Sequence, residues 1–278
     1  MKTIHAHGLE MPALGFGTYR LRGAEAEEGV RDALDVGYRH IDTAQMYRNE
    51  GDIGRALAAS PVDRDDVFLT TKVWPDHYAP DDLLDSVAAS LRKLQTDHVD
   101  LLLLHWPKFD VPMAETLAAL NDVHEAGQAK HIGVSNFTTA LMAEAQDLST
   151  APLAANQVEY HPFLRQTPVL EAVREADMTL TAYSPLAQGA VFENDTLDRI
   201  GARYRKSPGQ VSLRWLIQQD AVSAIPKASS PEHRRENFAV FDFNLTDEEM
   251  AAIHDLARPD GRTVNPRSLA PEWDDPGA

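Results

Sequence analysis

The feature of this sequence that most limits its possible folds is a regular alternation of strand-like and helix-like segments. Apolar runs typical of buried strands occur near residues 14–18, 38–43, 67–73, 98–105, 130–135, 154–159, 179–184 and 221–226. Polar residues that end consecutive runs are evenly spaced: Asp42 to Lys72 is 30 residues, Lys72 to His105 is 33, and His105 to Asn136 is 31. Each interval has room for one helix and two turns, so we predict crossover units and a parallel sheet.

Helix signals fill the intervals between these runs. After the third run, Leu83, Val87 and Leu91 fall on one helical face, and Asp82 stands in the first turn, where a negative charge is favourable. Gly127 is expected to end the following helix. The intervals therefore agree with one helix between each pair of strands.

The repeat predicts a closed (β/α)8 barrel, a TIM barrel, formed by residues 1–278 as one domain. No Gly-x-Gly-x-x-Gly sequence lies between a first strand and its helix, which argues against an open dinucleotide-binding sheet. Residues 2–12, with His-Gly between two short alternating runs, predict an N-terminal β-hairpin that plugs the bottom of the barrel. Residues 258–278 follow the last helix pattern and are expected to fold as a tail over the mouth, the end where the strands finish.

The amino-acid composition limits the cellular locations and the binding partners that suit this chain. The chain has no cysteine, which excludes disulfides, thiolate metal sites and a cysteine nucleophile and permits a cytoplasmic location. It has no long apolar run, and its formal net charge of −17 repels nucleic acid and anionic membranes. The acidic surface is either ordinary solvation or a halophilic adaptation, in which salt screens the self-repulsion.

Polar residues recur where the predicted strands end. In a barrel of this type functional side chains gather at the carboxyl ends of the strands. The residues that we expect at this mouth are Asp42, Lys72, His105, Asn136, Gln157, Tyr183 and Lys227.

Eight segments resemble one family, in the family's order and over nearly the whole chain. They are GFGTY (15–19), DTAQMYRNEGDIG (42–54), TTKVW (70–74), LLHWP (103–107), IGVSNF (132–137), NQVEYHP (156–162), AYSPLAQG (182–189) and IPKASSPEHRREN (225–237). The sequence is similar to the aldo-keto reductases, in particular to the prokaryotic 2,5-diketo-gluconate reductase-like members. The resemblance implies reduction of an aldehyde, ketone or keto-sugar by a nicotinamide cofactor, usually NADPH, bound without the glycine-rich fingerprint.

The residues at the strand ends suit this chemistry. Hydride transfer leaves charge on the carbonyl oxygen, so the site needs a proton donor. An isolated tyrosine, with a pKa of about 10, is a poor donor, and a nearby ammonium is expected to lower that pKa. By resemblance Tyr47 is the general acid, Lys72 and Asp42 tune it, and His105 orients the carbonyl. The alternative is that Asp42 and Lys72 form an ion pair that only stabilises the fold, and that His105 is a buried histidine of the core.

The resemblance also assigns a cofactor site. Amides and hydroxyls at Ser135, Asn136 and Gln157 suit a carboxamide, and Tyr183 offers a ring on which nicotinamide can stack. The remaining cofactor residues that it implies are Gly17, Thr18, Ser184, Leu186, Gln188, Gly189, Lys227, Ser229, His233, Glu236 and Asn237.

The adenosine end departs from the family pattern. Ala228 replaces the usual serine, and His233 replaces the usual arginine near the 2′-phosphate. Arg234 or Arg235 is a possible substitute, because a planar guanidinium suits phosphate. We therefore predict NADPH use with weaker discrimination against NADH.

Aromatic residues follow three strands and resemble a substrate wall: Tyr19, Trp74 and Trp106. The short segment 107–115 is expected to leave the mouth open to small or extended carbonyl compounds. Trp273 in the tail is a further candidate for substrate contact. We expect a monomer whose partner is a small molecule.

Two other functions remain open at this stage. A metal-dependent hydrolase would use His5, His7, His105, His131 and His161, but the first pair precedes the first barrel strand and we predict no metal. A regulatory subunit of the same fold would bind the cofactor and turn over negligibly.

Overall fold

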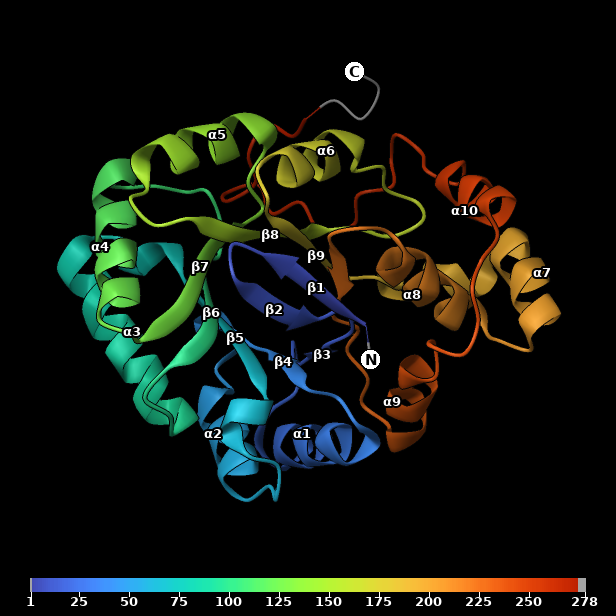
Figure 1. Ribbon diagram of the computed structural model, residues 1–278, viewed down its shortest axis with the longest axis horizontal. Coiled ribbons are helices and arrows are strands. Elements are labelled where there is room, and N and C mark those ends of the chain that lie inside the picture. Colours follow the sequence, from blue (N-terminus) through green and yellow to red (C-terminus); the bar gives the residue numbers. More distant parts are fainter. Residues whose placement is uncertain (1, 275–278) are drawn as a thin grey trace.

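The computed structural model describes residues 2–274, and its centre is a barrel of eight parallel strands (Figure 1). Adjacent strands in the chain pair in parallel, and Leu14 forms a parallel bridge to Ala224, which joins the first strand to the last. The predicted (β/α)8 fold is confirmed. The strands are β3 (Phe16–Gly17), β4 (His40–Asp42), β5 (Phe68–Val73), β6 (Val99–Leu104), β7 (Ala129–Ser135), β8 (Leu153–Glu159), β9 (Thr179–Tyr183) and β10 (Val222–Ala224).

Helices surround the barrel (Figure 1). Gly127 lies just beyond α4 with φ of 71°, a left-handed conformation that suits glycine past a helix end. The helices are α1 (Gly23–Val36), α2 (Glu50–Ala58), α3 (Pro80–Leu94), α4 (Met113–Glu125), α5 (Thr139–Leu148), α6 (Thr167–Glu175), α7 (Asp195–Tyr204), α8 (Pro208–Gln218), α9 (Pro231–Phe238) and α10 (Asp247–His254).

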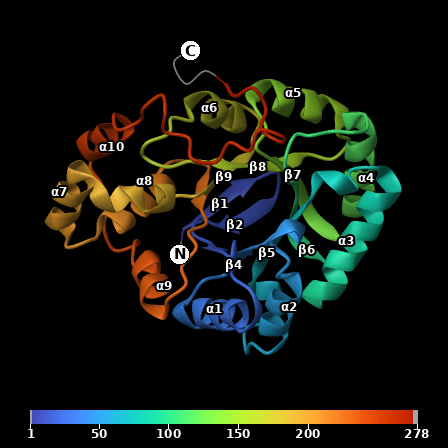
Figure 2. The same cartoon turned by 180° about the vertical axis from the view of Figure 1, so that it is seen from behind.

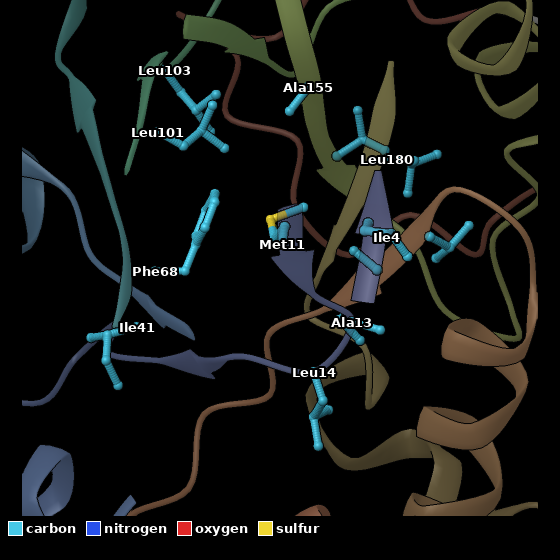
Figure 3. Packing of buried hydrophobic residues seen from close by; sticks show 14 of the residues in the cluster. Ile4, Met11, Ala13, Leu14, Ile41, Phe68, Leu101, Leu103, Ala155 and Leu180 are labelled. Atoms are coloured by element: carbon cyan, nitrogen blue, oxygen red, sulfur yellow. The ribbon is translucent and has the colours of Figure 1, made fainter. Parts of the chain in front are cut away.

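The interior of the barrel is filled by apolar side chains rather than forming a pore. Every residue of β5, β6 and β8 is buried, as expected for parallel strands covered on both faces. Figure 3 shows Phe68, Leu101 and Leu103 around Met11, which comes from the N-terminal hairpin. Packing of this kind fixes the strand ends, and with them the positions of the polar residues at the mouth.

The predicted N-terminal hairpin is present and consists of β1 (Thr3–Ala6) and β2 (Leu9–Pro12). His7 and Gly8 form its turn with φ of 46° and 80°. Lys2 Nζ donates to the carbonyl of Ile217 at 2.8 Å, just before β10, so the hairpin lies where the strands begin. It closes the bottom of the barrel as predicted.

The segment after α10 crosses the opposite end of the barrel (Figure 2, red). The backbone N–H groups of Thr263 and Val264 donate to the carboxylate of Glu159, at the end of β8. Farther on, Asp274 accepts hydrogen bonds from Thr139 at the start of α5. We call residues 258–274 the C-terminal segment; it covers part of the mouth, as predicted for the tail 258–278, whose last four residues, 275–278, lie outside the described residues. No helix among residues 2–274 has the length and apolar character required to span a bilayer.

A buried histidine makes the stability of the barrel sensitive to acid. Burial lowers the pKa of His40 to about 4, from an ordinary value of 6.5. Below pH 6.5 the His40 side chain is protonated in the unfolded chain, whereas in the folded chain it stays neutral until a lower pH. We expect stability to be lost between pH 6.5 and 4, with a contribution from His40 of about 3 kcal/mol.

Urea unfolding at pH 7 and pH 4.5 measures this loss. His40→Asn is expected to reduce the difference between the two pH values, whereas His77→Asn, at an exposed histidine, should leave it unchanged. If His40→Asn and the wild type lost the same amount of stability between pH 7 and pH 4.5, this result would contradict the assignment to His40.

Candidate active site

A buried ion pair forms the floor of the mouth. Asp42 ends β4 and Lys72 lies in the neighbouring strand β5; their side chains are 1% and 0% exposed. Lys72 Nζ donates to Asp42 Oδ1 at 2.6 Å and to the carbonyl of Thr43 at 2.8 Å. A charged amine at this depth requires such partners.

The loop after β4 brings a phenol to this pair. A short 3-10 helix, η1 (Gln45–Tyr47), turns the chain so that Lys72 Nζ is 3.5 Å from the phenol oxygen of Tyr47. The loop is fixed by Asn49, whose side chain accepts from Thr43 Oγ1 at 2.7 Å and donates to the carbonyl of Thr18 at 2.9 Å. The position of Tyr47 is therefore determined by buried contacts on both sides.

His105 completes the group at the end of β6. Its ring centre is 5.9 Å from that of Tyr47, and its buried Nδ1 has no hydrogen-bond partner among the described residues. Burial and the charge of Lys72 hold the pKa of His105 well below its ordinary value. The imidazole is therefore neutral near pH 7.

The pKa of Tyr47 differs from the sequence-based expectation. Burial raises it well above 10, and Asp42, Tyr183 and Tyr19 raise it further. Burial thus outweighs the lowering of this pKa that we expected from Lys72, whose ammonium is paired with Asp42 at 2.6 Å. Tyr47 is consequently a protonated acid throughout the neutral range.

One hydrogen-bond network links the ion pair to the predicted cofactor residues. Gln157 Nε2 donates to Asp42 Oδ2 at 2.8 Å, and Ser135 Oγ donates to the carbonyl of Gln157 at 2.8 Å. Asn136 Nδ2 donates to Ser135 Oγ at 3.1 Å and its Oδ1 accepts from the Tyr183 hydroxyl at 2.7 Å. The structure thus brings together residues from four separate strand ends.

These residues fit a nicotinamide. The hydroxyl of Tyr183 is held by Asn136, which fixes the ring at the end of β9 with part of its surface accessible. The Gln157 side chain donates only to Asp42, which leaves its amide oxygen for a carboxamide N–H. The site therefore offers a stacking surface beside an amide acceptor.

The loop after β9 carries the predicted residues Ser184, Leu186, Gln188 and Gly189. Ser184, Gln188 and Gly189 have φ of 49°, 53° and 101°, which is uncommon for residues other than glycine. Backbone turns of this kind can point successive N–H groups at an anion. This geometry fits a loop that crosses the pyrophosphate.

Gly17 and Thr18 lie at the end of β3 and make packing contacts there. A Cβ on Gly17 would lie 2.6 Å from the carbonyl oxygen of Ile225, so only glycine allows this close approach. Thr18 is completely buried and donates to the carbonyl of Asp42 at 2.8 Å. Their contacts position Asp42 and give no evidence of a direct cofactor role.

The predicted adenosine residues follow β10. Lys227 and Ser229 are exposed and joined by a 2.6 Å hydrogen bond, His233 is exposed in the first turn of α9, and Glu236 and Asn237 lie farther along the same helix.

Arg234 is not available as the phosphate ligand that the sequence left open. Its guanidinium donates to Asp32 at 2.5 Å and to the carbonyls of Ala228 and Ser229 at 3.1 and 2.9 Å. Arg235 lies 3.8 Å from the same aspartate. Arg234 therefore stabilises the loop instead of reaching the phosphate position.

The three predicted aromatic residues fall into two groups. The ring of Tyr19 lies 5.0 Å from that of Tyr47, and Trp74 lies 5.3 Å from His105. Trp106 is buried, and its ring is 6.4 Å from Trp273 of the C-terminal segment. Trp106 therefore connects this segment to the site.

Sequence reasoning missed three residues at the mouth. Gln45 Oε1 accepts from the backbone N–H of Trp74 at 3.0 Å and so positions that residue. Glu159 holds the C-terminal segment, and Arg262 stacks on Trp273. The motif NQVEYHP contained Glu159 and the motif DTAQMYRNEGDIG contained Gln45, whereas no quoted motif included Arg262.

A barrel whose mouth joins a phenol, a buried ammonium, a carboxylate and a neutral histidine has the proton-transfer groups of an oxidoreductase that acts on carbonyl compounds. The sequence pattern described as "Aldo/keto reductase family" matches residues 13–258. The chain belongs to the aldo-keto reductase family, and it is an enzyme that reduces carbonyl groups.

Individual relatives agree with this assignment over the full length. Methylglyoxal reductase DkgB of Escherichia coli O157:H7 is 38% identical over 269 residues, which cover 96% of this chain and 100% of the relative. A solved structure provisionally described as a 2,5-diketo-D-gluconic acid reductase B is 55% identical, covers 99% of this chain and 98% of its own, and gives a TM-score of 0.98. The Bombyx mori aldo-keto reductase in complex with NADP is 31% identical, with 96% and 95% coverage and a TM-score of 0.88.

Proposed function

We propose that this enzyme reduces small aldehydes, ketones or keto-sugars with NADPH, and that Tyr47 is the general acid. The observation that carries the proposal is the phenol oxygen of Tyr47, 3.5 Å from Lys72 Nζ and facing the ring of His105. When bound, the reduced nicotinamide supplies a hydride to the carbonyl carbon. Tyr47 then supplies the proton that the developing alkoxide requires.

Lys72 and Asp42 are proposed to position and hold this acid. The raised pKa of Tyr47 keeps the proton on the phenol until a stronger base, the alkoxide, forms beside it. Once the proton leaves, the ammonium of Lys72 lies next to the phenolate and stabilises it. Asp42 keeps Lys72 charged, because burial alone lowers the pKa of that amine.

His105 is proposed to orient the substrate as a neutral group. An imidazole without charge can donate one N–H to the carbonyl oxygen and cannot compete with Tyr47 as an acid. Ser135, Asn136, Gln157 and Tyr183 would hold the nicotinamide end of the cofactor. These roles rest on their shared network and on the partly accessible ring of Tyr183.

A panel of carbonyl substrates run with NADPH and with NADH tests the activity. The relatives described as acting on methylglyoxal and on a diketo-gluconic acid make both compounds appropriate members of the panel. Oxidation of NADPH that depends on a carbonyl compound is expected. Tight NADPH binding without turnover of any member would favour a regulatory subunit.

The cofactor preference is expected to be moderate. Ala228 lacks a hydroxyl, His233 stands where the family has an arginine, and Arg234 is engaged by Asp32. We expect the ratio of kcat/KM for NADPH over NADH to stay below about a thousandfold, or ~4 kcal/mol. His233→Arg should raise this ratio, and a wild-type ratio above a thousandfold would refute the prediction.

We also propose a cytoplasmic, monomeric enzyme with a surface adapted to salt. The formal net charge is −17, and the large exposed apolar side chains, Tyr19, Leu84, Leu148 and Phe192, come from separate elements. Screening should relieve the repulsion, so the melting temperature is expected to rise from low to molar KCl. A flat or falling series would remove the halophilic interpretation, and gel filtration tests the oligomeric state.

A further inference from the structure

Gln45, two residues before Tyr47, has a side-chain amide that is almost fully used in hydrogen bonds. Its Oε1 accepts from the backbone N–H of Trp74 at 3.0 Å, and its Nε2 donates to the hydroxyls of Ser86 and Ser90 at 3.1 and 3.2 Å. An amide has two N–H donors and one carbonyl oxygen, so these three partners fix which end of the amide faces Trp74. Gln45 is therefore held in one orientation between the loop after β4, the end of β5 and helix α3.

A buried carboxylate extends this network to the strand that carries Lys72. Glu50 stands in the first turn of α2, where a negative charge is favourable, and it is 1% exposed. Its Oε2 accepts from Ser90 Oγ at 3.2 Å, and its Oε1 accepts from the hydroxyl of Thr71, the residue before Lys72, at 2.8 Å. The network that begins at Gln45 therefore reaches β5 next to the buried amine.

The contact between the phenol and this amine has little tolerance for movement. The phenol oxygen of Tyr47 is 3.5 Å from Lys72 Nζ, which is the outer limit of a hydrogen bond. A shift of the loop by about 1 Å would end this contact, and a misplacement of that size can cost about 10² in rate. The position of the loop therefore decides whether Lys72 can stabilise the phenolate.

Two amides hold this loop from opposite sides. Asn49 connects its far end to the carbonyl of Thr18, just after β3. Gln45 connects its near end to α3 and to the backbone of Trp74, whose ring lies 5.3 Å from that of His105. One side chain thus fixes both the loop of the acid and the aromatic residue that faces His105.

We propose that Gln45 is a positioning residue that holds the phenol of Tyr47 within reach of Lys72. This inference rests on the proposed function and assigns Gln45 no contact with the reacting atoms. Without its amide the loop would be fixed at one end only, by Asn49, and the phenol would lose its place beside the ammonium. Proton transfer would slow, whereas the nicotinamide residues on β7, β8 and β9 would keep their own network.

Gln45→Met removes the amide and keeps the length of the side chain. It is expected to lower kcat for carbonyl reduction by about tenfold or more and to change the Kd of NADPH by less than about twofold. In the reverse reaction, oxidation of an alcohol, Tyr47 must start as a phenolate. The pH profile of that reaction should shift to higher pH, because the phenolate loses the nearby ammonium of Lys72. A substitution that only destabilised the fold would not move this profile.

Gln218→Met is the matched control. The Gln218 amide also makes three hydrogen bonds, with Arg214 and with the backbone of Leu245, but it lies at the end of α8, just before β10 begins at the base of the barrel. Its loss should lower the free energy of unfolding and leave kcat and the pH profile unchanged. Ser90→Ala breaks the link to Glu50 and should lower kcat by less than Gln45→Met, so it serves as the test if Gln45→Met does not fold.

Hydrogen exchange tests the contact without turnover. The N–H of Trp74 donates to Gln45 in the wild type, so its exchange should be at least about tenfold faster in Gln45→Met. Unchanged exchange would overturn the proposal, and so would faster exchange with an unchanged kcat and pH profile. A loss of NADPH affinity as large as the loss of kcat would also overturn it, since the effect would not be confined to proton transfer. Failure of the wild type to reduce any carbonyl compound would instead refute the proposed function, whatever the exchange of Trp74 shows.

Discussion

Tyr47→Phe is expected to reduce kcat for carbonyl reduction by a factor of about 10² to 10⁴, the usual contribution of a positioned general acid. The substitution removes one oxygen, 3.5 Å from Lys72 Nζ, and keeps the ring that packs 5.0 Å from Tyr19 and 5.9 Å from His105. NADPH binding should persist, since the phenol belongs to the proton-transfer step. Steady-state kinetics with NADPH, and fluorescence titration of the cofactor, separate the two effects.

A matched control removes a hydroxyl far from the mouth. The Tyr204 hydroxyl donates to Glu249 on the outside of the barrel, so Tyr204→Phe should keep the wild-type kcat. If Tyr47→Phe retained more than about a tenth of the wild-type kcat, Tyr47 would not be the acid. His105 would then be the next candidate, although its neutral state argues against that role.

Asp42→Ala is expected to lower the free energy of unfolding by about 3 to 5 kcal/mol, because it leaves a buried ammonium without its counter-ion. Lys72 is 0% exposed and would keep only the Thr43 carbonyl and the Tyr47 hydroxyl as acceptors. The Gln157 amide would lose its acceptor as well. Urea unfolding at pH 7 measures the loss.

The double variant Asp42→Ala/Lys72→Met tests whether the loss of stability comes from the buried ammonium that has lost its counter-ion. Removing both charges should cost clearly less than the sum of the two single changes, since neither charge is then stranded. Arg55→Met, which breaks an exposed pair with Glu27, provides a surface control and should cost no more than about 1 kcal/mol. Additive single effects would show that Asp42 and Lys72 do not depend on each other.

The barrel and the mouth residues could be predicted because both depend on local pattern. Apolar runs at intervals of about 30 residues place Asp42, Lys72 and His105 at successive strand ends, and parallel strands put all such ends on one rim. The C-terminal segment was also expected over the mouth, since it follows the last strand. These inferences need only periodicity and topology.

What the sequence could not provide depends on contacts between distant segments. Arg262 and Glu159 are 103 positions apart and meet only when the chain crosses the mouth. The occupation of Arg234 by Asp32 likewise depends on the packing of α9 against α1. The raised pKa of Tyr47 could not be predicted either, because its main cause is the burial of the phenol, which depends on side chains from separate parts of the chain.

The closure of one barrel end by the hairpin has a practical consequence for handling the enzyme. Residue 2 is attached near Ile217, at the base, whereas residues 263 and 264 lie over the rim where substrates must enter. An affinity tag or a solid support joined through the amino terminus would therefore leave the entrance clear. A bulky insertion beside residues 263 and 264 would instead lie over this entrance, and is expected to slow the uptake of large substrates before small ones.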